Sequence, residues 1–303
     1  MKSAIQLLFL IIATSLCSQN KGDTFRKNGD LEKAVKEYSI EYFKNKVDAK
    51  NTYKLASTYS LMYQKDSAFH YLKIALKNDT RLWVLADNDF YPLTKDNRWN
   101  DIEDLQFKKF QAKNGKIKNP TYAKQLIRLI IKDQALDYQQ DLARNYFMKN
   151  GKVPHWFYPI MQQKKEIASG NFVIMEQLIK DFGWPTYSNV GELAADAPLL
   201  VINHLESEEM RIKYLPQIKE ACLQKQGSCM EFAKINDRIL VNTGELQIYG
   251  MQFRYNSKRQ LEPFPIKDPE YVDQKRLAIG LEPIKKYLKR KINFNWTIKQ
   301  KTK

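Results

Sequence analysis

The sequence predicts an α+β protein that is predominantly α-helical, with helical hairpins in front of a helical domain that carries a small antiparallel β-sheet. Three observations support this class. Small and aromatic residues recur at a 34-residue interval near the N-terminus, and apolar residues follow helical spacing from residue 120 onward. After Asp237-Arg238 the apolar period changes from 3.6 toward 2, which is typical of strands.

The composition agrees with a folded chain and excludes several classes. Hydrophobic residues make up 43% of the 303 positions, which is enough for a sizeable core and excludes a disordered or collagen-like chain. Three cysteines and three scattered histidines exclude a disulfide-stapled scaffold and a four-thiolate zinc site, and we predict no metal site. The formal charge of +16 raises the question of an anionic partner.

Residues 1–18 have the features of an export signal. Lys2 supplies the positive end, and residues 5–13 form an apolar run that is too short to span a bilayer. We therefore expect an exported protein, periplasmic or secreted, that is soluble after removal of the signal. Lipid anchoring at Cys17 stays open but is not favoured, because Leu16 stands where a lipoprotein signal needs a small residue.

Cys222 and Cys229 lie seven positions apart around a predicted turn. In an oxidising compartment a disulfide between them is one interpretation, and two buried free thiols are an alternative of equal weight. A catalytic cysteine is the weakest interpretation, since no histidine lies in either neighbouring stretch.

Residues 22–107 are expected to form helical repeats. Ala34 and Ala68 occupy equivalent places in two similar stretches and lie 34 positions apart, and residues 82–105 have the spacing of a closing half-repeat. Small residues let paired helices approach each other, while aromatic residues fill the gaps. The stretch resembles a pair of degenerate tetratricopeptide repeats, which implies a docking platform for a protein partner.

Residues 108–119 are polar, basic and contain a glycine, so we expect a linker there. Asn119 and Pro120 then open a helix that we expect to continue to Gly151. Beside its apolar face runs a polar stripe, read either as a solvated edge or as the wall of a polar pocket. The stripe consists of Asp133, Asp137, Gln140 and Arg144.

The uncharacterised α+β domain is placed at residues 120–290. His204 follows Leu200 and Val201 at helical spacing, so we expect its side chain to point toward the interior. Residues 239–241 and 246–255 are predicted strands, joined by a turn at residues 242–244.

Many motifs of this domain occur together and in order. They are Asp133-Gln134, Gly183-Trp184-Pro185, Val190-Gly191, His204, Leu215-Pro216, Asp237-Arg238, Gln247-x-Tyr249-Gly250-x-Gln252, Pro265-x-x-Asp268, Arg276, Gly280-Leu281-x-Pro283 and Tyr287. The series resembles the bacterial family named domain of unknown function 6624. The chain departs from the family pattern at Asn203, Met251 and Asp137, where Gln, Thr and Arg are usual. The resemblance implies a domain without implying a reaction.

The polar residues of the domain form either a structural network or a site, because such groups cost free energy when they are buried unpaired. As a site, His204 would act as a general base whose ring is oriented by Asp133 or Asp237. The side chains expected to bind a ligand are Arg238, Tyr249, Gln252, Asp268 and Arg276. No Walker loop, dinucleotide glycine pattern or nucleophile elbow occurs, so the sequence leaves the cofactor unknown.

We therefore expect a cell-envelope protein that binds a ligand, such as a small anion, or a protein partner on a tetratricopeptide-like scaffold. The alternatives are a hydrolase with a polar pocket centred on His204 and a purely structural repeat protein. A basic tail is placed at residues 291–303, and residues 285–303 together carry eight positive charges and no negative one. Because export disfavours nucleic acid, we expect the tail to contact an anionic envelope surface, with a solvated, frayed end at residues 297–303.

Overall fold

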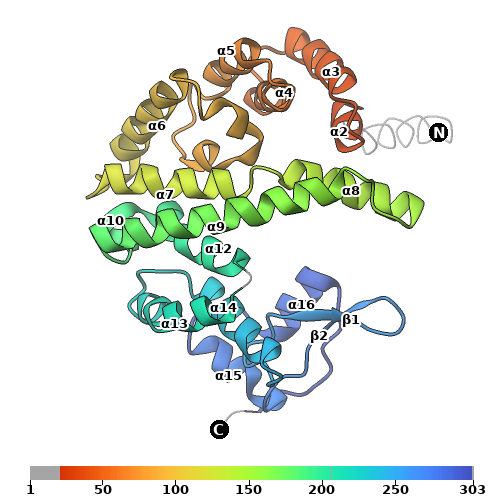
Figure 1. Cartoon of the computed structure of the whole chain (residues 1–303), viewed down its shortest axis with the longest axis vertical. Helices are drawn as coiled ribbons and strands as arrows, with labels where there is room; N and C mark the ends of the chain where they lie inside the picture. Colours follow the sequence, from red (N-terminus) through yellow and green to blue (C-terminus); the bar gives the residue numbers. More distant parts are fainter. Residues whose placement is uncertain (1–20, 206, 302–303) are drawn as a thin grey trace, which may run out of the picture. The chain divides into compact units, whose positions relative to one another are not determined.

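The computed structural model describes residues 21–205 and 207–301, which are mostly helical with a two-stranded antiparallel sheet (Figure 1). This confirms the predicted fold class. The predicted export signal lies outside the described residues. Among the residues described, no helix has the length and apolar character that a membrane crossing requires. The chain divides into two compact units, whose described parts are residues 21–116 with 134–164 and residues 117–133 with 165–205 and 207–301.

The first unit is built from short helices, and each consecutive pair from α2 to α5 packs together. Its elements are α2 (Lys21–Lys27), α3 (Leu31–Lys44), α4 (Ala49–Leu61), α5 (Lys65–Ala75), the 3-10 turns η1 (Trp83–Ala86) and η2 (Asn88–Leu93), α6 (Arg98–Asn114), α8 (Asp137–Asn150) and the first part of α9 (Phe157–Phe182).

Small residues allow the close packing of these helices. Ala34 in α3 and Ala68 in α5 are both completely buried. A Cβ atom on Gly22 would lie 2.5 Å from the ring of Tyr38, so α2 approaches α3 more closely than any larger residue would permit. The hydroxyl of Tyr38 donates a hydrogen bond to Asp23 at 2.6 Å, which fixes the same pair of helices. The buried alanines thus account for the 34-residue interval in the sequence.

The predicted linker at residues 108–119 is largely helical, which corrects that expectation. Helix α6 continues to Asn114 because Ile102 and Phe107 bury one of its faces. The helix ends at Gly115, whose φ of 93° is a left-handed conformation that glycine adopts at little cost.

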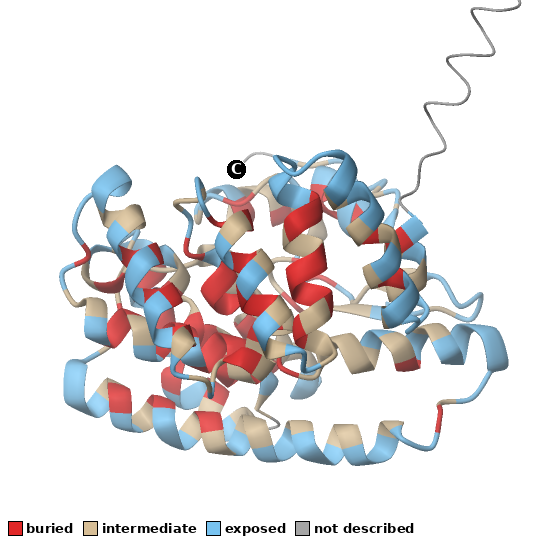
Figure 2. Cartoon of the chain, turned by 90° about the horizontal axis from the view of Figure 1, so that it is seen from above, coloured by how far each residue is buried: buried red, intermediate tan, exposed pale blue. Residues whose placement is uncertain are grey.

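The second unit is also helical and carries the sheet. Its elements are α7 (Pro120–Asp133), the second part of α9, α10 (Tyr187–Val190), α11 (Glu192–Ala195), α12 (Ala197–His204), α13 (Glu208–Leu223), α14 (Cys229–Asn242), β1 (Phe253–Tyr255), β2 (Leu261–Pro263), the 3-10 turn η3 (Pro269–Tyr271), α15 (Val272–Leu277) and α16 (Ile284–Ile292). Figure 2 shows the chain coloured by burial, and buried residues alternate with exposed ones along its helices.

Helix α7 organises one half of this unit. Helices α10, α11 and α12 all pack against it. Asn119 caps its first turn, since its side-chain oxygen accepts a hydrogen bond from the N–H of Tyr122 at 3.0 Å. Tyr122 stacks on Phe182 of α9 with ring centroids 4.7 Å apart, and its hydroxyl donates to the carbonyl of Gly183. The aromatic residues therefore bind the start of α7 to the end of α9.

Three expected elements differ in the structure. The single helix expected from Pro120 to Gly151 breaks at residues 134–136, so α7 and α8 are separate helices. Residues 239–241 are not a strand but the end of α14, because Ile235 and Ile239 continue its buried face. The strand expected over 246–255 is reduced to β1, which pairs with β2 in the register Phe253 with Pro263.

The C-terminal segment is part of the fold as far as residue 301. This corrects the expectation of a frayed end at residues 297–303 for the residues that the structure describes. Phe294 and Trp296 pack against a buried cluster that includes Ile284 and Leu288 of α16. The side chain of Gln300 donates to the carbonyl of Pro269 and accepts from the N–H of Asp273, both at 3.0 Å. These bonds tie the last described residues to the turn before α15 and to the first turn of α15 itself.

Candidate functional site

The candidate site forms where two helices of the second unit end. Asp133 is the last residue of α7, and His204 is the last residue of α12, which packs against α7. The break after α7 therefore creates the position from which the Asp133 carboxylate reaches the histidine. A carboxylate at a helix C-terminus gains nothing from the helix dipole, so this buried acid depends on a partner of its own.

His204 and Asp133 form a close pair. Nδ1 of His204 lies 2.5 Å from Oδ2 of Asp133, and the side chains are 39% and 2% exposed. The expectation that His204 points into the interior was wrong, because the ring is at the surface and only its Nδ1 edge meets the buried carboxylate. The histidine is thus held on one side and accessible on the other.

This pairing fixes the chemistry of the ring. An ionised carboxylate can only accept hydrogen bonds, so the proton of a neutral His204 resides on Nδ1. The lone pair is then on Nε2, away from Asp133. A neutral imidazole with an oriented Nδ1–H, on a side chain that is 39% exposed, is the arrangement of a general base.

Two arginines hold the end of the helix that carries His204. Arg238 donates from Nη1 to the carbonyl of Asn203 at 2.9 Å, and Arg211 donates to the carbonyls of Asn203 and Leu205. Burial and the neighbouring Arg211 lower the pKa of Arg238. The two cations satisfy carbonyls at the negative end of α12, and Arg211 also pairs with Glu208. Arg211 was missed in the sequence, although its position in the first turn of a helix with an acidic start was visible.

Asp237 has a different role from Asp133. It is completely buried and accepts backbone N–H hydrogen bonds from Ile248, Tyr249 and Met251 at 2.8 to 3.1 Å. Burial raises the pKa of Asp237, and the three backbone donors act against that rise. The carboxylate therefore stabilises the 247–252 loop and does not orient the ring of His204.

Gln252 and Arg276 belong to the same loop network. The amide of Gln252 donates to the carbonyl of Lys234, while the fully buried Arg276 donates to the carbonyls of Tyr249 and Glu282. The guanidinium of Arg276 also lies 4.7 Å from the ring centroid of Tyr287, and burial lowers its pKa. These polar groups are engaged by main-chain atoms, so they contribute to the fold of the loop.

The remaining predicted residues lie elsewhere. Asp268 is an exposed residue with a φ of 48° that pairs with Lys275 at 3.3 Å. Tyr249 is half-buried with its ring 5.9 Å from that of Phe232, and burial raises the pKa of its hydroxyl. Neither contact leads to His204.

The polar stripe beside the expected long helix does not remain together. Asp133 belongs to the second unit, whereas the other three residues lie on α8 of the first unit. Asp137 pairs with Lys164 at 2.6 Å, and Arg144 pairs with Asp141 at 3.0 Å. Asp137, which stands where the family usually has Arg, thus has a cationic partner within its own unit.

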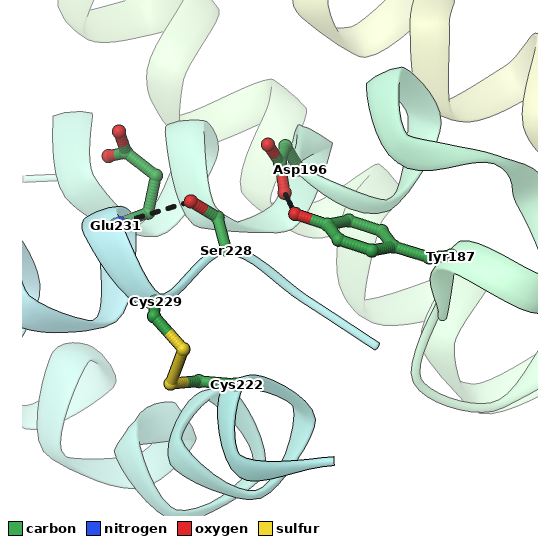
Figure 3. Close-up of a disulfide and its surroundings, with 6 residues drawn as sticks. All are labelled: Tyr187, Asp196, Cys222, Ser228, Cys229 and Glu231. Atoms are coloured by element: carbon green, nitrogen blue, oxygen red, sulfur yellow. Dashed lines mark hydrogen bonds between the residues drawn. A yellow bond between two sulfur atoms is a disulfide. The ribbon is translucent and has the colours of Figure 1, made fainter. Parts of the chain in front are cut away.

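A disulfide closes the turn between α13 and α14. Cys222 and Cys229 are bonded with their Cα atoms 4.7 Å apart, which decides between the two interpretations of the sequence (Figure 3). Ser228 caps α14 by accepting from the N–H of Glu231. The carbonyl of Gln226, which lies in the bridged turn, also accepts a hydrogen bond from the N–H of Tyr187. The disulfide thereby supports the segment from which α10 to α12 begin.

A partly buried acid, Asp196, lies beside this turn. The hydroxyl of Tyr187 donates to Asp196 at 3.3 Å (Figure 3). Burial, followed by the negative charge of Glu231, raises the pKa of Asp196 to about 6. Among the described residues, no group of three or more histidine, cysteine and acidic side chains is placed to hold a metal ion.

Comparisons with known proteins identify the second half of the chain. Residues 120–301 match a family of unknown function, DUF6624. No curated protein matches the chain, and no solved structure matches it either. The match covers more than half of the 303 residues and includes both members of the His204–Asp133 pair. The chain therefore belongs to the DUF6624 family.

Proposed function

We propose that the DUF6624 domain is a hydrolase in which His204 acts as the general base. The observation that carries this proposal is the 2.5 Å contact between Nδ1 of His204 and the buried Asp133, on a ring that is 39% exposed. Asp133 orients the ring and stabilises the imidazolium that forms when Nε2 removes a proton from water. Arg211 and Arg238 keep the end of α12, and with it His204, in place.

The chain provides its own controls for this proposal. His70 and His155 are its other two histidines, and both are exposed. The purified protein would be tested against nitrophenyl esters, phosphates and glycosides, together with His204→Asn, Asp133→Asn, His70→Asn and His155→Asn. We expect His204→Asn to lower kcat by about 100-fold or more, and Asp133→Asn to lower it as well, since general-base catalysis typically contributes about 10²- to 10⁴-fold. The other two variants should retain full activity. Hydrolysis that survives in His204→Asn would refute the assignment.

We further propose that the protein is exported to the cell envelope and that its helical repeats bind a protein partner. The support is the apolar segment at residues 5–13 and the exposed aromatic side chains of the first unit. Phe43, Tyr63 and Trp83 are 66%, 70% and 68% exposed. If binding is the whole function, His204→Ala would leave folding and partner binding intact and no substrate of the panel would be hydrolysed.

Export is tested separately. The mass of the mature N-terminus would show whether residues 1–18 are removed.

A further inference from the structure

A cavity of about 570 Å³ opens in the first unit, lined by the start of α4, the end of α5, the turn that follows α5 and the end of α6. Ligand pockets commonly have volumes of roughly 300–1,000 Å³. The cavity combines apolar side chains with basic ones. They are Val47, Ile74, Lys46, Lys77, Arg81 and Lys113.

One wall of the cavity is held rigidly by α6. Lys109 donates to the carbonyls of Leu76 and Lys77 at 2.6 and 3.1 Å. Gln106 donates to the carbonyls of Asp79 and Arg81 at 3.2 and 2.9 Å. Four carbonyls of the turn at residues 76–81 are therefore fixed by two side chains of one helix. A site that is ordered before binding loses less entropy when a ligand enters.

The positive charge of the cavity is only partly neutralised. Asp79 pairs with Arg81 at 2.6 Å, and this pair lowers the pKa of the Asp79 carboxyl. Within residues 21–116, the structure shows no carboxylate bonded to Lys46, Lys77 or Lys113. The first turn of α4 lines the cavity through Ala49 and Thr52, and the carboxylate of Asp48 caps it by accepting from two N–H groups. Four cationic side chains, Lys46, Lys77, Arg81 and Lys113, thus stand against the two carboxylates of Asp48 and Asp79. The field inside the cavity therefore favours an anion.

We propose that this cavity binds an organic anion, a carboxylate or a phosphate carried on an apolar body. The anionic group contacts Lys46, Lys77 and Lys113, and the apolar body packs on Val47 and Ile74. Because the lining residues lie between positions 46 and 113, the proposal does not depend on the chemistry of His204.

The test is calorimetric titration of the full chain with octanoate and with octyl phosphate. Octanol serves as the uncharged analogue, and inorganic phosphate as the anion without an apolar body. The triple variant Lys46→Gln, Lys77→Gln, Lys113→Gln is compared with Lys36→Gln, Lys73→Gln, Lys95→Gln, which removes three charges from exposed positions outside the cavity. We expect the cavity variant to bind about tenfold more weakly and the control variant to bind like the wild type.

Binding of either octanoate or octyl phosphate supports the proposal if it depends on the cavity lysines, and the stronger of the two identifies the head group. Equal weakening in both triple variants would overturn it, because the effect would then come from net charge. Binding of octanol, or of inorganic phosphate, as tight as that of octyl phosphate would overturn it too. If the triple variant loses thermal stability, Lys113→Gln alone, at an exposed position near the end of α6, replaces it with the same expected direction.

Discussion

Replacing Asp237 by asparagine tests whether this acid is a structural residue of the 247–252 loop. Each carboxylate oxygen accepts from two backbone N–H groups, and Tyr249 bonds to both oxygens. In Asp237→Asn one oxygen becomes an NH2 group, so at least one buried N–H, that of Ile248 or Met251, loses its acceptor. An unsatisfied buried donor costs about 1–3 kcal/mol, and the remaining hydrogen bonds lose their charge assistance.

The removal of a buried charge offsets part of this loss, because burial already raises the pKa of Asp237. We therefore expect the free energy of unfolding to fall by about 2–3 kcal/mol. Urea denaturation followed by tryptophan fluorescence measures the change. Asp268→Asn is the matched control, since it breaks an ion pair with Lys275 whose acid is 59% exposed and should cost less than about 1 kcal/mol. If Asp237→Asn stays within about 0.5 kcal/mol of the wild type, the loop is not held by this carboxylate.

Two further variants probe the segment around the disulfide. Burial and Glu231 raise the pKa of Asp196 to about 6, above its value of about 4 in an unfolded chain, so stability falls as pH rises between these values. Asp196→Asn should remove this dependence and raise stability at pH 7 by about 2 kcal/mol, and melting curves that shift equally at pH 4 and pH 7 would contradict it. Replacing Cys222 and Cys229 by serine opens a short loop and should lower stability by about 2.5 kcal/mol. Reduction of the wild-type disulfide should lower the urea midpoint of unfolding by the same amount. If the midpoint stays unchanged in the reduced protein and in the double serine variant, the disulfide does not stabilise the fold.

Local sequence signals predicted the helices well where apolar spacing was regular. The cap at Asn119 and the buried alanines at positions 34 and 68 are examples, since each depends on residues close in sequence. The strand at 239–241 was predicted wrongly, and of the strand predicted at 246–255 only residues 253–255 form one. Val241 and its neighbours are β-branched or bulky, but the preceding face of α14 continues through Ile239, and tertiary packing outweighs such propensities.

The loop at residues 247–252 could not be predicted because its order depends on distant groups. Gly250 has a φ of 74°, and a Cβ atom there would lie 2.5 Å from Ile284. The carboxylate of Asp237 and the guanidinium of Arg276 bind its main chain from α14 and α15. The spacing of apolar residues along the sequence carries no information about such long-range contacts. The ordered loop therefore looked like a strand in the sequence.

The candidate site was predicted in part. His204 and Asp133 were both singled out, and the structure places them in contact. Asp237 was considered as the alternative partner of the histidine, yet its oxygens are engaged by the loop. The sequence alone cannot choose between two acids that lie 71 and 33 positions from the histidine, because the choice depends on where α7 ends.

The two compact units are interleaved along the chain, which affects how the protein folds during synthesis. Helix α7 belongs to the second unit, yet the ribosome makes it before α8, which belongs to the first. At about 5–20 residues per second, the roughly 70 residues from the end of α7 to the end of α12 take several seconds to appear. During that interval the apolar residues of α7 that are buried in the finished unit, among them Tyr122, Leu126 and Ile130, are made before the helix α12 that packs against α7. The nascent chain thus exposes an apolar helix face until α12 is made, and transiently exposed apolar surface of this kind makes a folding chain prone to aggregate.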